Sequence, residues 1–492
     1  MLALTCAILS GCGGGGSEPP PAAPLDLSRL SVSASGFSDA RILAPAPGAP
    51  AGDLELSTNM VGATILARFS CQGCHITASA QGGEASEGQD LPIYFASLDE
   101  GSSIAIDVVD LDSGARGTYR LMARPATAAT YRFAASGAQE PGDLYLTLNG
   151  SRQALPTPAY AYMVKGDGSL KYYRQGSAGL YDFKKTILRD GSAQYSVYDG
   201  AVGGLKIFDA AMLPIGTFNP IPLVGKDPGR PDAHDHILTT ATRRTLLTAQ
   251  NVDVFDVPSR MGQPSKALAA GIQETEGDAL IFSWSSADHP ELYSCSTDGN
   301  DYGGSAYADY AHINSVTIDD DGDFIASFRH LDAVVKIRRV DGSIAWILGG
   351  PCDQFNLAPN QKFSHQHYAR RLADGRLGLF DDGNASGRSR ALAFSLDESA
   401  KTLARSSASP SFAEFVPGAP LLGLPVRGST AQGSAQFFAS GRILVGWGYM
   451  PGKPSAVDLT EFDSATGAVN FELALNPVSG VQIYDYRAQK FQ

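Results

Sequence analysis

The chain has 492 residues, enough for two or three domains, and its formal net charge is −13 at pH 7. This acidic balance argues against a nucleic-acid partner, because phosphate binding needs a basic face, yet it leaves room for an anionic small substrate in a locally positive pocket. No apolar run beyond the first residues is long enough to span a bilayer, and the 54 glycines and 29 prolines are spread as in proteins of many short strands joined by turns.

The N-terminal residues form a short apolar run that leads into Leu9-Ser10-Gly11-Cys12. This tetrapeptide resembles the lipobox at which bacterial lipoproteins are cleaved and acylated on cysteine. We therefore expect residues 1–12 to be a lipoprotein-type signal segment with lipid on Cys12, and residues 13–24 to be a Gly/Pro-rich flexible tether. No lysine or arginine precedes the apolar run, so we expect the true signal to begin upstream of Met1. The lipid would attach the protein to a membrane of the bacterial cell envelope, in the periplasm or at the surface.

Six cysteines occur in the chain, and two of them, Cys6 and Cys12, belong to the predicted signal segment. The other four are Cys71, Cys74, Cys295 and Cys352. An even number in an oxidising compartment indicates two disulfides, and of the three possible pairings, proximity in sequence favours Cys71–Cys74 and Cys295–Cys352. The segment Cys71-Gln-Gly-Cys74-His75 also fits the c-type haem attachment pattern, but no helix nearby would enclose a haem. We favour the disulfide and leave the haem open.

Residues 25–126 alternate β-branched and polar side chains between Gly/Asp turns, a pattern typical of short strands. The clearest candidate strands are 31–34, 63–69, 103–109 and 118–123. Nothing in this region has the apolar spacing of a long helix. We predict a small N-terminal β-sandwich.

Residues 127–492 contain a loose repeat in which a hydrophobic strand, an Asp/Gly turn and an aromatic-bearing strand follow one another. Examples are 166–173, 334–347 and 459–471. At ~40–50 residues per four-stranded blade, with insertions, the region would hold about six or seven blades. We predict an all-β fold in which a six-bladed, or seven-bladed, β-propeller follows the sandwich. A pair of β-sandwiches is the alternative, but a closed propeller hides more strand edges.

Eight histidines are present, and six of them lie in three short segments of the repeat region. The segments are 232–236, with His234 and His236; 311–330, with His312 and His330; and 363–367, with His365 and His367. The loops of different propeller blades converge at one axial opening. The three pairs can therefore meet in one site.

These segments and their flanks resemble the arylsulfate sulfotransferase family, bacterial propeller enzymes that move a sulfuryl group between phenols. The matching segments occur in the family's order and are Asp309–Val316, Ser327–Arg329, Gly342–Gly350, Phe363–Arg370, Leu379–Asn384, Gly433–Phe437 and Ile443–Gly448. Together they extend over most of residues 156–475, whereas the N-terminal region adds little to the resemblance.

The resemblance implies that His367 is the nucleophile that becomes transiently sulfated, and that His312 and Arg329 hold the sulfate oxygens. His234 matches the first of the family's active-site histidines. The chain departs from the family after this point, where it has Thr239–Thr245 in place of a run with Leu-Pro-Asn-Gly-Asn, so either His234 or His236 fits the position. His365 is not part of the family's pattern, and we place it with His236 among the residues expected to bind substrate.

Sulfuryl transfer itself calls for these residue types. Charge develops on peripheral oxygens while nucleophile and leaving group lie in line, as in phosphoryl transfer. A neutral imidazole can attack, an arginine fork can hold two sulfonate oxygens, and a second histidine can protonate the departing phenolate. A sulfated histidine implies ping-pong kinetics with an aryl sulfate and a phenol, no cofactor and no nucleotide sulfate donor.

Other readings of these residues remain. The His-x-His pairs, with Asp232 or Asp235, could bind zinc or copper, but Arg329 would be an awkward neighbour for a cation, so we predict no metal. His289 and His330 are assigned as ordinary surface or hydrogen-bonded residues. The run Asp319–Asp323 lacks the spaced glutamate of a calcium loop and predicts a hairpin turn. A non-catalytic or metal-binding propeller that binds a ligand or partner is the alternative to the enzyme.

Overall fold

A computed structural model gives the structure of the chain, and the description below covers residues 30–34, 42–43, 53–57, 64–80, 83–86, 88–94, 103–112, 114, 116–124, 131–150, 159–168, 170–176, 178–210, 214–223, 229–254, 265–297, 307–404, 410–424, 428–450, 457–476 and 483–492. Within these residues the chain is all-β, with strands β1 to β36 and three short 3₁₀ helices. No helix among them is long and apolar enough to cross a membrane. The predicted signal segment, the tether and Cys12 lie outside the described residues.

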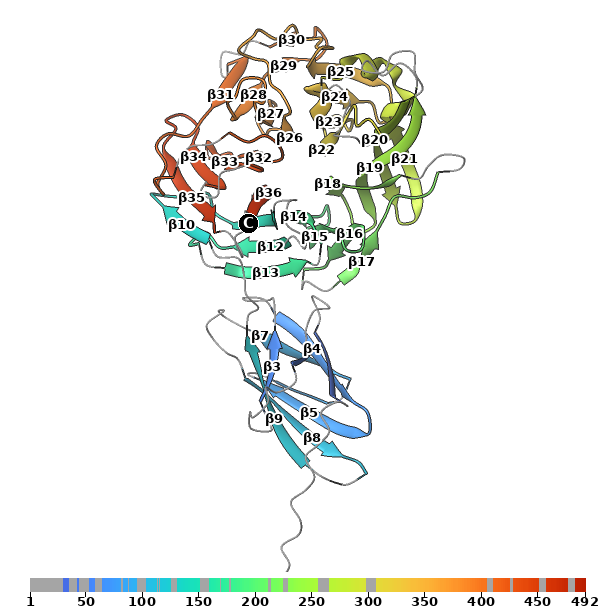
Figure 1. Cartoon of the computed structure of the whole chain (residues 1–492), viewed down its shortest axis with the longest axis vertical. Helices are drawn as coiled ribbons and strands as arrows, with labels where there is room; N and C mark the ends of the chain where they lie inside the picture. The colour runs from blue at the N-terminus through green and yellow to red at the C-terminus, as the bar shows by residue number, and fades with distance from the viewer. Residues whose placement is uncertain are drawn as a thin grey trace, which may run out of the picture.

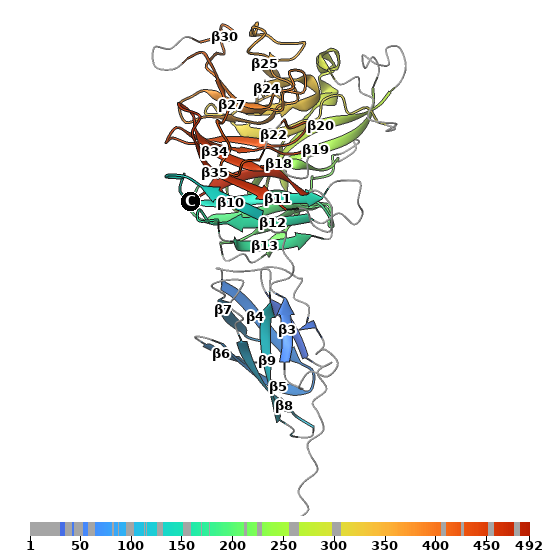
Figure 2. The ribbon, with the colours of Figure 1, turned by 60° about the vertical axis from the view of Figure 1, so that its left-hand side comes forward.

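The N-terminal strands form two sheets, blue to cyan in Figures 1 and 2. One is three-stranded and contains, in spatial order, β1 (Leu30–Ala34), β4 (Thr64–Cys71) and β7 (Asp90–Tyr94). The other is six-stranded, in the order β2 (Ile42–Leu43), β3 (Asp53–Ser57), β9 (Arg116–Arg124), β8 (Ser103–Asp110), β5 (Cys74–Ala80) and β6 (Gly83–Ser86). The four candidate strands of this region coincide with β1, β4, β8 and β9. The predicted boundary at residue 126 falls among residues that are not described.

Six further sheets of antiparallel strands follow, and each is named here by its first strand apart from β10. The β11 sheet has the order β13 (Leu170–Gly176), β12 (Ala159–Val164), β11 (Asp143–Gly150) and β36 (Ile483–Phe491). The β14 sheet contains β14 (Leu180–Ile187), β15 (Ala193–Asp199), β16 (Gly204–Phe208) and β17 (Pro214–Phe218). The β18 sheet contains β18 (Arg230–Leu238), β19 (Arg243–Val254), β20 (Ser265–Glu276) and β21 (Ala279–Ser285).

The remaining three sheets complete a propeller-like arrangement (Figure 1). The β22 sheet contains β22 (Ile313–Ile318), β23 (Phe324–Phe328), β24 (Ala333–Ile337) and β25 (Ile344–Gly349). The β26 sheet contains β26 (His367–Arg371), β27 (Leu377–Asp381), β28 (Arg390–Phe394) and β31 (Phe412–Phe415). The β32 sheet has the order β10 (Tyr131–Ala135), β35 (Val469–Leu475), β34 (Leu459–Asp463), β33 (Arg442–Gly446) and β32 (Ser434–Phe437). The short strands β29 (Leu396–Asp397) and β30 (Thr402–Leu403) pair with each other.

Hydrophobic side chains fill the space between neighbouring sheets. Ile313 and Trp284 belong to a core shared by the β18 and β22 sheets, whereas Val334 and Leu379 belong to the next core, between the β22 and β26 sheets. Strands such as β24 are buried at every residue because both faces of the sheet are covered. Such strands can therefore contain consecutive apolar residues, such as 333–335 of β24, without the alternation of a one-sided sheet.

Two strands close the ring of sheets by pairing across the ends of the chain. β36, close to the C-terminus, pairs with β11 and becomes the inner strand of the first of these sheets. β10 precedes that sheet in sequence but pairs with β35 as an outer strand of the last. The two closures bring Leu144 and Leu459, more than three hundred residues apart, into one hydrophobic core.

Turns predicted from Asp/Gly signals lie where expected. The segments around 167, 341 and 465 each join two antiparallel strands of one sheet. Asp319–Asp323 is a tight turn between β22 and β23, closed by a hydrogen bond from the Asp319 N–H to the Asp323 carbonyl. Lys336 Nζ contacts the carboxylates of Asp319 (2.8 Å) and Asp321 (2.6 Å). These carboxylates bind a protein cation, which supports the hairpin interpretation over a calcium loop.

The predicted disulfide Cys295–Cys352 is confirmed, with a Cα–Cα distance of 5.3 Å. It ties the 3₁₀ helix Pro290–Cys295 to the segment that follows β25. Cys74 is also disulfide-bonded, which leaves no thiol there for a haem thioether. The side chain of Cys71 lies outside the described residues, so its pairing with Cys74 stays a prediction.

Candidate active site

Three of the sheets contribute the predicted site residues, and the histidines lie at or just before an inner strand. His234 and His236 are on β18, and His312 immediately precedes β22. Arg329 begins the 3₁₀ helix Arg329–Leu331, which connects β23 to β24. His367 is the first residue of β26. Because the inner strands of these sheets are neighbours, four segments far apart in sequence meet near the axis.

His367 is buried and is oriented by three hydrogen bonds. Its Nδ1 lies 2.6 Å from Asp382 Oδ2 and 3.0 Å from the His365 carbonyl oxygen. The backbone N–H of Gln432 donates to its Nε2 over 3.2 Å. Nε2 must therefore be the nitrogen without a proton, and Nδ1 must be the donor, since a carbonyl oxygen can only accept. The site fixes the tautomer in which Nε2 carries the lone pair, which here accepts from the Gln432 N–H.

The electrostatic surroundings keep this imidazole neutral. Burial, followed by the positive charge of Arg329, holds the pKa of His367 well below its ordinary value. Burial also raises the pKa of Asp382, whose Oδ2 contacts Nδ1 of His367. A neutral imidazole with a fixed tautomer is a nucleophile that needs no prior deprotonation.

A carboxylate favours the protonated form of His312, in contrast to His367. Its Nδ1 lies 2.5 Å from Asp309 Oδ2. Burial lowers the pKa of His312, but the charge of Asp309 and this hydrogen bond outweigh burial, so the net pKa is raised. The same contact lowers the pKa of Asp309 to about 2 against the effect of its burial. The raised pKa favours the protonated form of His312, which suits it to donate a proton.

Arg329 is held by two neighbours. Its Nη1 donates to His330 Nε2 over 2.7 Å, and its Nη2 donates to the Thr430 carbonyl over 3.1 Å. His330 in turn donates from Nδ1 to the Asp309 carbonyl oxygen. Burial, then the charge of His312, holds the pKa of His330 well below its ordinary value, as accepting from Arg329 requires. His330 is hydrogen-bonded, as the sequence analysis assigned it, but it is also completely buried inside the site, where it orients Arg329.

His234 is the histidine of β18 that joins the site. Its ring lies edge-on to that of His312, with centroids 4.8 Å apart. Asp232 Oδ1 accepts from the His234 backbone N–H (2.9 Å) and contacts its Nδ1 (2.5 Å). The hydroxyl of Tyr486, on β36, donates to the His234 carbonyl over 3.0 Å. Nδ1 is engaged, so Nε2 is again the nitrogen turned to the site.

His236 faces a different set of partners, because a β-bulge between Pro231 and His236 interrupts the alternation of side chains along β18. Its ring contacts Ser196 (2.7 Å) and Asp182 (3.1 Å), away from the other site histidines. Burial, then the charge of Lys184, lowers the pKa of His236. His236 is therefore part of what we call the ion cluster, which comprises Asp182, Lys184, Asp235, His236, Arg370 and Arg487.

His365 lies beside the site without contacting His367 through its ring. Its backbone carbonyl accepts from His367, its backbone N–H donates to Asp332 over 2.6 Å, and its ring centroid is 6.1 Å from that of His330. The backbone here is strained: His312, His365 and Gln432 all have φ between 52° and 72°. Such left-handed non-glycine residues persist where the surrounding structure holds them, and they concentrate at functional sites.

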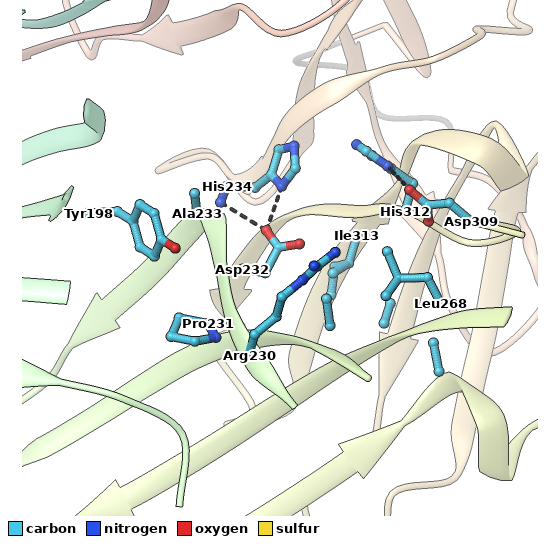
Figure 3. A pocket seen from close by; sticks show the side chains of 13 residues that line it. Tyr198, Arg230, Pro231, Asp232, Ala233, His234, Leu268, Asp309, His312 and Ile313 are labelled. Carbon is cyan, nitrogen blue, oxygen red and sulfur yellow. Dashed lines mark hydrogen bonds and ion pairs between the residues drawn. The ribbon is translucent and has the colours of Figure 1, made fainter. Parts of the chain in front are cut away.

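A cavity of about 380 Å³ opens beside the His234–His312 pair (Figure 3). Asp232 and Asp309 are among its walls, each in contact with its histidine. His367 and Arg329 are not among the residues that line it. The two histidines therefore border the cavity, and their charges also act on the pKa of His367.

Comparison with known proteins agrees with this geometry. Residues 225–458 match the model of the family described as arylsulfotransferase (ASST). The match covers just under half of the chain and supports the resemblance to this family that the sequence motifs indicated. The match spans β18 to the residue before β34, and so includes His234, His312, Arg329 and His367. No curated protein sequence matches the chain.

Solved structures resemble the chain only distantly. A protein of unknown function from Bacteroides caccae is 10% identical, with 70% of this chain and 99% of that chain covered and a TM-score of 0.37. A putative 6-phosphogluconolactonase from Bacteroides fragilis is 11% identical, with 86% and 99% covered and a TM-score of 0.30. A streptogramin B lyase is 12% identical, with 77% and 91% covered and a TM-score of 0.30. At these TM-scores the likenesses carry no argument about fold or function.

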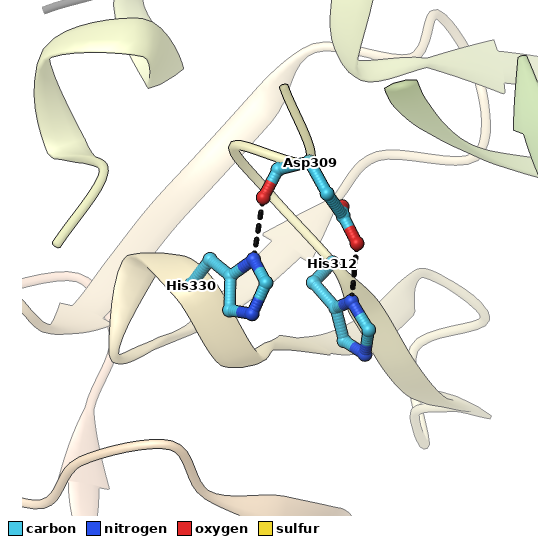
Figure 4. Close-up of side chains that lie close together, drawn as sticks. All are labelled: Asp309, His312 and His330. Carbon is cyan, nitrogen blue, oxygen red and sulfur yellow. Dashed lines mark hydrogen bonds and ion pairs between the residues drawn. The ribbon is translucent and has the colours of Figure 1, made fainter. Parts of the chain in front are cut away.

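One trio within the candidate site has the residue types of a metal centre: Asp309, His312 and His330 have ligand atoms within 4.8 Å of one another (Figure 4). Three of the four ring nitrogens of these two histidines already have hydrogen-bond partners, however. His330 Nε2 accepts from Arg329 and its Nδ1 donates to a carbonyl, while His312 Nδ1 contacts Asp309. The fixed positive charge of Arg329, bonded to one member of the trio, does not fit a cation ligand set.

The sequence pattern did not predict the carboxylates that orient the histidines of the candidate site. Asp309 and Asp232 lie three and two residues before their histidines, a local spacing that was open to detection. Asp382 is fifteen residues from His367 and meets it because β26 and β27 pair. Its position inside the matched segment Leu379–Asn384 was the available signal.

Proposed function

We propose that the chain moves a sulfuryl group from an aryl sulfate donor to a phenolic acceptor through a sulfated His367, by a ping-pong mechanism and without a nucleotide sulfate donor. The family match supports aryl sulfotransferase activity in general. The observation that carries the finer proposal is the neutral, fixed tautomer of His367, with Nε2 as its electron-pair donor beside Arg329 and His312.

In the first half-reaction His367 Nε2 attacks the sulfur of the aryl sulfate. The new N–S bond forms as the S–O bond to the aryl group breaks, and the electron pair leaves on the phenolate oxygen. His312 gives that oxygen its Nε2 proton, because its raised pKa keeps a proton available. The first phenol then departs and leaves sulfohistidine behind.

In the second half-reaction an acceptor phenol attacks the same sulfur. His312, now neutral, takes the phenolic proton as the O–S bond forms, and the N–S bond breaks to restore His367. Throughout, the guanidinium of Arg329 faces the sulfonate oxygens with an orientation set by His330 and Thr430. Fixed donors of this kind stabilise developing charge without reorganising during the reaction. His234 supplies a further donor at the side of His312.

The test uses the purified chain with 4-nitrophenyl sulfate as donor and phenol as acceptor. We expect release of 4-nitrophenol that depends on phenol, and its loss in His367→Ala. His75→Ala is the matched control, because His75 is an exposed histidine of the N-terminal sheets. Without acceptor, mass spectrometry of quenched protein should find one sulfuryl group on the peptide that contains His367. Acceptor-dependent turnover in His367→Ala, or sulfation of another residue, would overturn the mechanism.

A non-catalytic or metal-binding surface propeller is the second candidate. The trio Asp309, His312 and His330 is the observation in its favour, and its engagement with Arg329 is the observation against it. The same assay separates the two. Activity that resists a chelator supports the sulfotransferase, whereas inactivity together with stoichiometric bound metal supports the alternative.

We further infer six propeller blades after an N-terminal β-sandwich, with the boundary near residue 126. Six sheets of four or more antiparallel strands, the shared cores between their neighbours and the closure by β36 and β10 support the blade count. The two separate N-terminal sheets support the sandwich. Limited proteolysis should cleave first near residues 125–130 and release a propeller fragment that keeps its activity.

The envelope location rests on the lipobox-like Leu9–Cys12 and on the disulfides expected outside the cytoplasm. We propose that lipid on Cys12 attaches the protein to a bacterial membrane. Metabolic labelling with a palmitate analogue should mark the wild-type protein and not Cys12→Ser. Equal labelling of both proteins would contradict the proposal.

A further inference from the structure

Arg230 is a positively charged residue of the cavity wall that has no role in the proposed sulfuryl transfer. It is the first residue of β18 and lines the cavity near Asp232. Figure 3 shows its guanidinium turned into the cavity, with dashed lines from Asp232 to His234 but none to Arg230. Within the described part of the chain, this guanidinium has no hydrogen bond or ion pair. Most arginines of the surrounding sheets differ: Arg370, for example, is paired with Asp235 over 2.6 Å.

The rest of the cavity wall suits an aromatic ring. Six of its residues are apolar: Pro231, Ala249, Leu268, Ala269, Ala270 and Ile313. Tyr198 adds an aromatic face. Ala269, Ala270 and Ile313 are buried, so this wall belongs to the rigid core of the β18 and β22 sheets. A preformed apolar wall with a few convergent polar groups is the usual form of a small-molecule site.

The charged groups of the cavity are arranged in two parts. Asp232 and Asp309 each contact a histidine, and the charges of these two histidines act on the pKa of His367. Arg230 provides positive charge without a carboxylate bonded to it. An aromatic molecule that lies along the apolar wall can therefore present one polar end to His312 and an anionic end to Arg230.

We propose that Arg230 recognises an anionic substituent on the phenolic substrate, so that phenols with a second acidic group, such as hydroxybenzoates, are the preferred acceptors. This inference rests on the proposed sulfotransferase function and names its substrate class. The planar fork of arginine matches a carboxylate with two parallel hydrogen bonds, which a lysine cannot reproduce. Arg230 acts as a specificity residue and takes no part in the transfer step.

The experiment compares two acceptors of nearly equal shape, 4-hydroxybenzoate and its neutral methyl ester, with 4-nitrophenyl sulfate as the common donor. Wild-type protein should favour the carboxylate in kcat/KM. Arg230→Gln should lose about 10- to 100-fold in kcat/KM with 4-hydroxybenzoate, the range for a lost charge-assisted hydrogen bond, and change little with the ester. Arg230→Lys should recover part of the loss. Arg338→Gln, at an exposed arginine of the β24–β25 turn, is the matched control.

Binding of 4-hydroxybenzoate, measured by calorimetry without donor, separates this inference from the function on which it rests. Turnover of phenol with equal kcat/KM for the two acceptors, or an equal loss for both in Arg230→Gln, overturns the role of Arg230 and leaves the sulfotransferase intact. Absence of all turnover, together with Arg230-dependent binding of 4-hydroxybenzoate, overturns the sulfotransferase and retains the anion site. Absence of both turnover and binding overturns both.

Discussion

Two groups of buried charged and polar residues lie near the axis, and they use carboxylates differently. In the ion cluster, Asp182 and Asp235 are shared among cations: Lys184 contacts both, at 2.7 and 2.8 Å, and Arg487 contacts both, at 2.9 and 3.3 Å. Around the active site each carboxylate instead contacts Nδ1 of one histidine, as Asp382 does with His367. The first arrangement neutralises charge, whereas the second leaves a ring nitrogen available for chemistry.

The difference also appears between two His–Asp pairs of the site itself. His367–Asp382 and His312–Asp309 have nearly the same hydrogen-bond length, 2.6 and 2.5 Å. Yet the pKa of His367 is lowered, chiefly by burial and by Arg329, and that of His312 is raised because Asp309 outweighs burial. A His–Asp contact alone therefore does not define a role. The surrounding charge differs between the two pairs, and it is this difference that suits His367 to the nucleophile and His312 to the acid of the proposed mechanism.

The largest effect is expected when the nucleophile loses its orientation. Asp382→Asn should lower kcat by about 10³- to 10⁴-fold, because an amide can hydrogen-bond either tautomer of His367. Folding should be unaffected, since the side chains are nearly equal in shape. Steady-state kinetics and urea unfolding of the same preparation measure the two quantities. A kcat within a small factor of wild type would show that Asp382 does not set the tautomer.

Next in size is removal of the central cation of the ion cluster. Arg487→Met should lower the free energy of unfolding by about 3–5 kcal/mol, because Asp182 and Asp235 lose a partner while fully buried. Urea unfolding measures the loss, and the exposed Arg338→Gln serves as control. If Arg487→Met unfolds like wild type but has lost activity, the ion cluster belongs to the site rather than to the scaffold.

A smaller effect is expected on the pH profile when the acid loses its carboxylate. The raised pKa of His312 keeps the acid protonated to higher pH, so Asp309→Asn should move the basic limb of the kcat profile about one unit lower. In stability, the contribution of a raised histidine pKa is complete below about pH 6.5 and is lost as pH rises through the folded-state value. The variant should therefore lose stability at acidic pH more than at alkaline pH. A profile that keeps its basic limb would exclude His312 as the acid.

The smallest effect on activity is expected at the second histidine of β18. His236→Gln should change kcat/KM by less than about 3-fold, because the ring bonds Ser196 and Asp182 rather than the site, and should cost about 1 kcal/mol of stability for the weakened bonds. His234→Gln is the matched comparison and should lower kcat/KM far more. Equal kinetic losses in the two variants would restore His236 to the substrate-binding role that the sequence suggested.

Much of the fold was predictable because its signals are local. Asp/Gly turns such as that of Asp319–Asp323 separate strands, and consecutive apolar residues such as 333–335 occur because neighbouring sheets cover both faces. The ordered motifs predicted which segments meet, and the family match over residues 225–458 supports the resemblance on which they rest.

What escaped prediction depends on contacts between distant residues. A bulge in β18 separates the rings of His234 and His236. The residue types of that strand did not lead us to predict the bulge. His330 looked ordinary because its partners, Arg329 and the Asp309 carbonyl, give it a role only after β22 and β23 have paired. Arg487 meets Asp182 from 305 residues away, so no spacing rule links them.

Because β36 completes the first of the six sheets, the fold cannot be completed before the end of the chain has been synthesised. The same nine residues complete the first of the six sheets and deliver Tyr486 to His234 and Arg487 to the ion cluster. A chain synthesised from its N-terminus holds a first sheet of only three strands, β11 to β13, until β36 arrives, and pairings of such long range form slowly. Synthesis that stops before β36 therefore yields a product with neither a sealed ring nor a supported site, which quality-control proteases can recognise.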